Sequence, residues 1–407
     1  MPSFAIITMR YVWSLILIMS AVSTLAETVD ADTLFSVNQS EVACTSVASD
    51  ADTIYTPKQI IIQKIIRYFD DSNKPPSDKK IDFSLIGGPA YSSDTKLSLG
   101  ILGAALYTAG NNSSTTSQSN ATLYTEFSIT GYYNVGIRGT HFTPYDSWRF
   151  NYKMSFSSMP TYFWGIGFDS ARQNDNKTKY LQLNAEVKAS FDYSLPGNCY
   201  VGPALHFNYT RAKNAEDYAL WNNEHLSTFN YGVGVNLYHD SRDCLTAPHR
   251  GWYIGLEQRF YPRFLSNKDA FSSTDVTICR YFGAWRDAIV AIDVHGLFTY
   301  GNTPWSMLAS VGGSRTMRGY YEGRYRDKNA VDVTVELRQH IWHRNSAVVW
   351  VGAGSVFPEF KNLQSREILP NFGVGYRWEF KKNVNVRLDF GLGKGESGIV
   401  FNLNEAF

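Results

Sequence analysis

A glycine- and arginine-rich stretch is the first place where this chain could do chemistry. Residues 312–329 read Gly-Gly-Ser-Arg-Thr-Met-Arg-Gly-Tyr-Tyr-Glu-Gly-Arg-Tyr-Arg-Asp-Lys-Asn. An arginine presents a planar fork of N–H donors that matches a carboxylate. Arg318 in this stretch could therefore bind an acidic partner if the loop folds back into a polar interior. From the residues alone, a solvated loop charge is the alternative.

Residues for hydrolysis or for phosphate binding are not spaced for either chemistry. His206, His239, His295 and His340 have no distinctive nucleophile motif near them. The consecutive residues His239, Asp240 and Ser241 would alternate between the two faces of a strand. The glycines at 312–323 lack the Lys-Ser/Thr ending of a phosphate loop. We expect no enzyme and no cofactor.

The cysteines do not indicate a metal site. Cys44, Cys199, Cys244 and Cys279 show no CxxC pair and no Cys/His spacing for zinc. An exported protein could oxidise them, or all four could stay as thiols. The pairing is left open.

The composition favours a particular class of protein. The chain has 407 residues, of which 15% are aromatic and 18% charged, and its net charge is +1. A charge so close to zero offers no basic field for nucleic acid. The slightly negative mean hydropathy suits a soluble protein, and it equally suits a lipid-facing barrel with a polar interior.

The first eighty residues are predicted to precede the main fold. Residues 1–26 have the pattern of a cleaved signal peptide, with Arg10, a short apolar core and Ala26 at the cleavage point. A buried N-terminal helix is the alternative. Residues 27–80 form a short periplasmic leader, in which 57–71 has helical spacing before Pro75 and Pro76.

From residue 81 onward the hydrophobic period changes to two. Leu181, Leu183, Ala185, Val187, Ala189, Phe191 and Tyr193 share one face of a segment, and polar residues fill the other face. The same alternation recurs around 252–260, 331–341, 372–380 and 384–392. Such long alternating strands suit a tilted crossing of a membrane, where a free sheet edge would leave backbone groups unpaired. The pattern predicts an all-β, sixteen-stranded antiparallel transmembrane barrel over residues 81–407.

The predicted connections alternate in length. Short turns fall at 144–146, 196–198, 286–287, 343–345 and 381–383, and long polar loops near 169–179, 211–226, 262–273, 302–330 and 357–368. Short periplasmic turns with long outer loops are typical of outer-membrane barrels. The long stretch 110–120 is an exception on the periplasmic side.

Two motifs resemble one known family. The tetrad Met317-Arg318-Gly319-Tyr320, with Gly312 and Gly313 before it, resembles the long sixth outer loop of the BamA-like superfamily, also called bacterial surface antigens. The stretch from Asp240 to Tyr253 resembles the mid-barrel turn of that family. The chain also finishes in alternation, through Phe401 and Leu403 to Phe407, like the insertion signal of such barrels.

The resemblance implies a loop folded into the lumen and locked there. It implies Glu336 as the acidic partner of Arg318. A second family acid, in a Phe-x-Asp-x-Gly pattern, is replaced by Gly352, so Asp389 or Glu379 is the alternative second partner.

The resemblance also implies a seam between the first and last strands. Gly87, Gly88 and Pro89 would shorten the pairing with 399–407, including Phe401, Leu403 and Phe407. This is either a gate or an ordinary frayed strand start.

The sequence is compatible with three functions. Members of the family insert or translocate proteins at the bacterial outer membrane, with lipid, a separate periplasmic protein or unfolded barrels as partners. No complete POTRA domain fits the pattern of 27–80, which puts a self-sufficient assembly role in doubt. A passive pore or structural surface barrel is the second reading, and a barrel hydrolase is the third.

Overall fold

The computed structural model describes residues 81–92, 96–108, 119–221, 224–381 and 384–407. The predicted signal peptide, leader and helix at 57–71 lie outside the described residues and stay predictions. So does most of the stretch 110–120. The described chain is almost all β-structure, as predicted.

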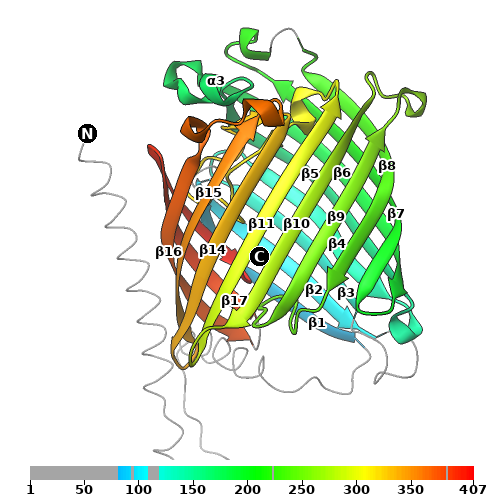
Figure 1. Ribbon diagram of the computed structural model, residues 1–407, viewed down its shortest axis with the longest axis vertical. Coiled ribbons are helices and arrows are strands. Elements are labelled where there is room, and N and C mark those ends of the chain that lie inside the picture. The colour runs from blue at the N-terminus through cyan, green and yellow to red at the C-terminus, as the bar shows by residue number, and fades with distance from the viewer. Residues whose placement is uncertain (1–80, 93–95, 109–118, 222–223, 382–383) are drawn as a thin grey trace, which may run out of the picture. The chain divides into compact units, whose positions relative to one another are not determined.

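The strands follow one another along the chain with few interruptions (Figure 1). Their bounds are β1 (Ile81–Ser92), β2 (Lys96–Tyr107), β3 (Ser119–Ser128), β4 (Tyr133–Phe142), β5 (Trp148–Phe163), β6 (Thr178–Leu195), β7 (Cys199–Lys213), β8 (Ser227–Asp240), β9 (Gly251–Tyr261), β10 (Phe271–Gly283), β11 (Ala288–Gly301), β12 (Ala309–Ser310), β13 (Arg326–Asp327), β14 (Asn329–Trp342), β15 (Asn345–Phe357), β16 (Leu369–Lys381), β17 (Val384–Gly393) and β18 (Glu396–Leu403). One short helix, α3 (Phe168–Arg172), lies between β5 and β6.

The long strands form one antiparallel sheet that curls into a barrel. Its order is β1-β18-β17-β16-β15-β14-β11-β10-β9-β8-β7-β6-β5-β4-β3-β2. β12 and β13 pair only with each other, within the connection from β11 to β14. β1 pairs with β2 from Ile81 to Ser92, whereas its register with β18 is a single pair, Ser92 with Val400.

The two ends of the barrel differ in their connections. At one end, called the turn end here, the described connections include 143–147, 196–198 and 284–287. At the other, the loop end, they include 164–177 and 302–328, together with the described parts of 214–226. This contrast matches the predicted alternation of short turns and long loops.

Side chains alternate between the two faces of the sheet because successive strand residues point to opposite sides. On β8, Val233, Val235 and Leu237 are exposed on the outer face, while Asn230 and Asn236 are buried on the inner one. β14 repeats this arrangement with Val333 and Val335 outside and Asp332, Thr334 and Glu336 inside. The barrel therefore has an apolar outer surface and a polar core.

Candidate functional site

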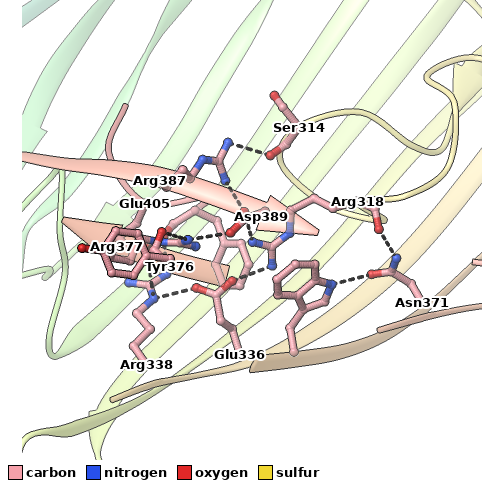
Figure 2. A network of polar contacts seen from close by, with 12 residues as sticks. Ser314, Arg318, Glu336, Arg338, Asn371, Tyr376, Arg377, Arg387, Asp389 and Glu405 are labelled. Carbon is pink, nitrogen blue, oxygen red and sulfur yellow. Dashed lines mark hydrogen bonds and ion pairs between the residues drawn. The ribbon is translucent and has the colours of Figure 1, made fainter. Parts of the chain in front are cut away.

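Arg318 lies inside the barrel against β14 and β17, on the loop that connects β11 with β14 (Figure 2). Its side chain has no exposed area. Nη2 donates to Glu336 Oε2 at 2.5 Å, and Nη1 donates to Asp389 Oδ2 at 2.8 Å. The guanidinium thus bridges two carboxylates on two strands instead of forking onto one. The loop is tied at once to β14 and to β17.

The two carboxylates belong to a larger network of ion pairs. Glu336 also accepts from Arg338 at 2.7 Å, and Asp389 accepts from Arg377 at 2.5 Å. Arg387 lies 3.5 Å from Asp389 and donates to the backbone oxygen of Ser314 at 2.7 Å (Figure 2). Removing one partner from a buried network leaves uncompensated charge, which typically costs about 3–5 kcal/mol.

Trp350 and Asn371 complete the seat of Arg318, and the sequence did not single them out. The Trp350 ring centroid lies 3.7 Å from the guanidinium carbon of Arg318. Trp350 Nε1 donates to Asn371 Oδ1 at 2.9 Å, and Asn371 Nδ2 donates to the Arg318 backbone oxygen. Trp350 stands at the Phe position of the Phe-x-Asp-x-Gly pattern. This place in the motif could have predicted a contact with Arg318, because an indole can stack on a cation and also donate a hydrogen bond.

Glycines let the loop backbone approach the wall closely. Gly319 has φ +114°, and a Cβ there would lie 2.6 Å from the carbonyl carbon of Gly391 on β17. A Cβ on Gly391 would in turn collide with the Arg318 backbone oxygen. Gly312 and Gly313 also have positive φ. The spacing of these glycines follows from the conformation that the loop needs.

Tyr320 fixes the loop to the strands beside β17. Its hydroxyl donates to the Pro370 backbone oxygen at 2.7 Å and accepts from the Lys394 backbone N–H at 2.7 Å. Burial raises the pKa of Tyr320 to about 12. The phenol therefore keeps its donor into the alkaline range, above the pH at which an exposed tyrosine ionises.

Further contacts carry the loop across the interior. Arg315 Nη2 lies 3.1 Å from Asp293 of β11. The Tyr321 backbone N–H donates to Glu396 of β18 at 2.7 Å, and Arg324 pairs with the same carboxylate at 2.8 Å. The Tyr321 hydroxyl lies 2.9 Å from Thr161 Oγ1 on β5. The loop is thus bonded to strands on both sides of the interior.

An aromatic cluster at the loop end includes Trp305, which belongs to the connection from β11 to β14. Trp305 donates from Nε1 to the His225 backbone oxygen at 3.0 Å and is fully buried. Trp221 stacks on Phe163 with ring centroids 4.4 Å apart, and Tyr180 lies 5.3 Å from the Trp221 ring. Trp305 and Trp221 come from two separate connections, and Phe163 and Tyr180 from the ends of β5 and β6. The spacing of these residues along the chain did not predict that they form a cluster.

The last described residues correct one prediction. Phe407 was expected at the seam between the first and last strands, but its ring packs inside the barrel beside Cys279, Tyr281 and Ala291. β18 ends at Leu403, and Asn404 turns inward with φ +64°. The physical reason is the charge at position 405, which the interior arginines bind.

Glu405 joins this tail to the network beneath the loop. Its Oε2 lies 2.9 Å from Arg377 Nε and 3.6 Å from Arg338 Nε (Figure 2). Its Oε1 accepts from Asn385 Nδ2 at 2.6 Å. Burial opposes ionisation, but the guanidinium groups of Arg338 and Arg377 win and lower the pKa of Glu405.

The remaining predicted seam residues lie on the first and last strands. Gly87, Gly88 and Pro89 are in β1 and register with Ile101, Gly100 and Leu99 of β2. Phe401 and Leu403 of β18 register with Leu388 and Val386 of β17. Opening between β1 and β18 stays a prediction.

The histidines considered for hydrolysis lie apart and have other partners. His206 Nδ1 lies 2.6 Å from the Tyr261 hydroxyl, and His295 lies between Asp275 and Asp332 at 3.3 and 3.2 Å. His239 Nδ1 lies 3.7 Å from Cys199 Sγ. Within the described ranges, Cys199, Cys244 and Cys279 are free thiols, and no group of His, Cys, Asp or Glu is placed to hold a metal ion.

Comparison with known proteins gives one family match. The profile of the Omp85 superfamily domain matches residues 101–407. A search of curated proteins found no match. No helix in the described part of the chain is long and apolar enough to cross a membrane.

Solved structures share the fold at low sequence identity. BamA from Haemophilus ducreyi lacking POTRA domains 1–3 is 13% identical with a TM-score of 0.54, and the match covers 79% of this chain and 70% of that one. CdiB from Acinetobacter baumannii is 12% identical with a TM-score of 0.51, covering 80% and 60%. CdiB from Escherichia coli is 11% identical with a TM-score of 0.55, covering 81% and 64%. The chain thus spans less than two thirds of either CdiB chain.

Proposed function

Since the chain belongs to the Omp85 superfamily, we propose that it is an outer-membrane barrel that inserts or translocates other proteins. The sixteen strands of the sheet order constitute the transmembrane wall, with the turn end in the periplasm and the loop end outside. Outer-membrane lipid surrounds it, and polypeptides are its substrates. The same proposal gives it no catalytic role.

The outer face supports the membrane location. Large apolar side chains are exposed along it on successive strands, among them Leu123, Met154, Leu205, Val235, Val351 and Phe372. A tilted strand needs about 9–11 residues to cross the hydrocarbon. β5 to β8 have 14 to 18 residues, which is enough with a margin at each end.

The bridge from Arg318 to Glu336 and Asp389 carries the proposal. A passive pore would need an open interior, whereas this interior is crossed by a loop bonded to β5, β11, β14, β17 and β18. Burying an ion network costs desolvation free energy, and the network gives the loop one defined position. Such a loop suits a machine whose interior is closed at rest.

Depletion in the native bacterium tests the assembly role. Lowering the level of this chain should lower other outer-membrane proteins while periplasmic proteins stay constant. Unchanged outer-membrane proteins would contradict the insertion role. In a separate experiment, a pull-down with this protein as bait would show whether a periplasmic protein binds at the turn end.

Conductance separates this proposal from a passive pore. The wild-type protein in planar bilayers should be mostly closed, and Arg318→Ala should raise the conductance by releasing the loop. A large steady conductance that Arg318→Ala leaves unchanged would favour a passive barrel. Arg286→Ala, on the exposed turn between β10 and β11, is the matched control.

A further inference from the structure

A cavity of about 490 Å³ lies inside the barrel, from the turn end toward the middle of β4 to β10. Two carboxylates line it, on Asp240 and Glu257, against six cationic side chains: Arg149, Lys153, Lys188, Arg242, Arg259 and Arg315. The chain as a whole carries a net charge of only +1. The cavity thus gathers positive charge that composition does not reveal.

Three of these cations are matched by carboxylates of their own. Arg242 binds Asp240 at 2.9 Å, Arg259 binds Glu257 at 3.0 Å and Arg315 binds Asp293 at 3.1 Å. These pairs need no further anion. The surplus therefore lies on β5 and β6, where the other three cations are.

Lys153 and Lys188 lie directly opposite each other on neighbouring strands. They are registered partners of β5 and β6, and their side chains are 43% and 46% exposed. Both bind Glu186, at 2.6 and 3.2 Å, and His206 lies 3.3 Å from the same carboxylate. Like charges directly opposite each other destabilise a sheet. The two ammonium groups share one carboxylate, so together they carry more positive charge than Glu186 alone offsets.

Arg149 adds a third cationic group to the same wall. Its guanidinium carbon lies 4.2 Å from the Tyr200 ring centroid and 4.8 Å from that of Phe142, and its Nε is buried without a hydrogen-bond partner. Asp192 is its registered partner across the sheet. The Asp192 carboxylate accepts from Asn151, Ser190 and Tyr238.

The rest of the lining indicates the kind of anion. Phe142, Tyr238, Tyr253 and Phe407 stand among the cations, so apolar and charged surfaces alternate. The volume falls in the range of about 300–1,000 Å³ typical of ligand pockets. A polypeptide segment with acidic and apolar side chains matches this mixture better than a bare phosphate.

We propose that this cavity binds an acidic segment of a client polypeptide, with its carboxylates on Lys153, Lys188 and Arg149. The inference rests on the proposed function only in taking the ligand to be a protein substrate. Binding can be measured on the purified protein alone, so a failure here leaves the assembly role untouched. Conversely, binding would survive if depletion had no effect on other outer-membrane proteins.

The test uses a fluorescent hexaglutamate peptide and the full mature chain in detergent micelles. Fluorescence anisotropy should show binding of hexaglutamate and none of hexaglutamine. Lys188→Gln should weaken the affinity about tenfold, and Lys153→Gln with Lys188→Gln further. Lys361→Gln, which removes an exposed lysine far from the cavity, should leave the affinity unchanged.

Stability distinguishes a binding lysine from a structural one. Lys188→Gln removes a like-charge pair and leaves Lys153 bound to Glu186, so the melting temperature should stay or rise. A fall in melting temperature together with unchanged peptide affinity would overturn the proposal. So would equal binding of hexaglutamine, or full displacement of the peptide by millimolar inorganic phosphate, which would identify a phosphate site.

Discussion

The interior of the barrel holds its charges in two different ways. Beneath the loop, Arg318, Glu336 and Asp389 have no exposed side-chain area and bind one another at 2.5 and 2.8 Å. Along β5 and β6, Lys153 and Lys188 face each other, are nearly half exposed and share Glu186. The first region is built to hold a segment in one place, because every charge has a partner. The second keeps an unfavourable pair, which is typical of a surface selected for binding.

The largest expected effect is at the centre of the closed region. Arg318→Ala should lower the free energy of unfolding by about 3 kcal/mol, the lower part of the range for a broken buried network, because Arg338, Arg377 and Arg387 still neutralise the two carboxylates. Urea unfolding in micelles measures it, with heat-modifiable mobility on gels as a second readout. If Arg318→Ala unfolded like the wild type, the loop would not be locked by this residue.

A glycine next to the lock should give the second largest effect. Gly391→Ala places a methyl group against the Arg318 backbone oxygen, so the loop must move away from β17. We expect a loss of about 2 kcal/mol, as for overpacking in a tight core. Gly283→Ala is the control, since its Cβ would meet only the Ala288 backbone oxygen at 3.9 Å. Equal stabilities for both variants would rule out the close approach.

The indole of Trp350 should contribute less than the ion pairs. Trp350→Phe keeps an aromatic ring near Arg318 but removes the donor to Asn371, a loss of about 1 kcal/mol for a buried hydrogen bond. Trp285→Phe removes a comparable bond to Gln339 on an exposed turn and should cost less. Chemical denaturation of the two variants side by side decides the question. A larger loss at Trp285 would contradict the role given to Trp350.

The smallest effect concerns the tail and depends on pH. Because the pKa of Glu405 is lowered in the folded protein, its ionised form stabilises the fold above the unfolded pKa of about 4.3. That contribution disappears as the pH falls through the folded pKa. Glu405→Gln keeps an amide oxygen that can accept from Arg377, so it should be less stable than wild type by only about 0.5 kcal/mol at pH 7, with the difference vanishing at acid pH. A difference that persisted undiminished at pH 3 would contradict this assignment.

The loop and its first partner were accessible from the sequence. Arg318 stands in the motif that resembles the family's, and the resemblance implied Glu336, on the inward face of the next long strand, as its partner. Asp389 was one of two candidates for the second partner. The choice between Asp389 and Glu379 depends on which residue of which strand reaches the loop, and that is set by strand register and loop path together.

Other features were out of reach from the residues alone. In the sequence, Phe407 continues the alternation that includes Phe401. Its ring nevertheless packs beside Cys279 and Tyr281, because Arg377 binds Glu405 inside the barrel. The facing of Lys153 and Lys188 depends on the β5 to β6 register, which turn geometry decides. Neither feature can be predicted from the spacing of polar and apolar residues along the chain.

The amino-acid sequence by itself determined the all-β architecture, the two faces of each strand and the motif that crosses the interior. These follow from local rules, since a period of two and a glycine-rich arginine motif are read along the chain. Only the tertiary structure decided which charges meet: Arg318 with Asp389, Trp350 beneath it, and the two lysines left facing each other. Such contacts join residues far apart in sequence, and they exist only once the sheet has curled and brought its inner faces together.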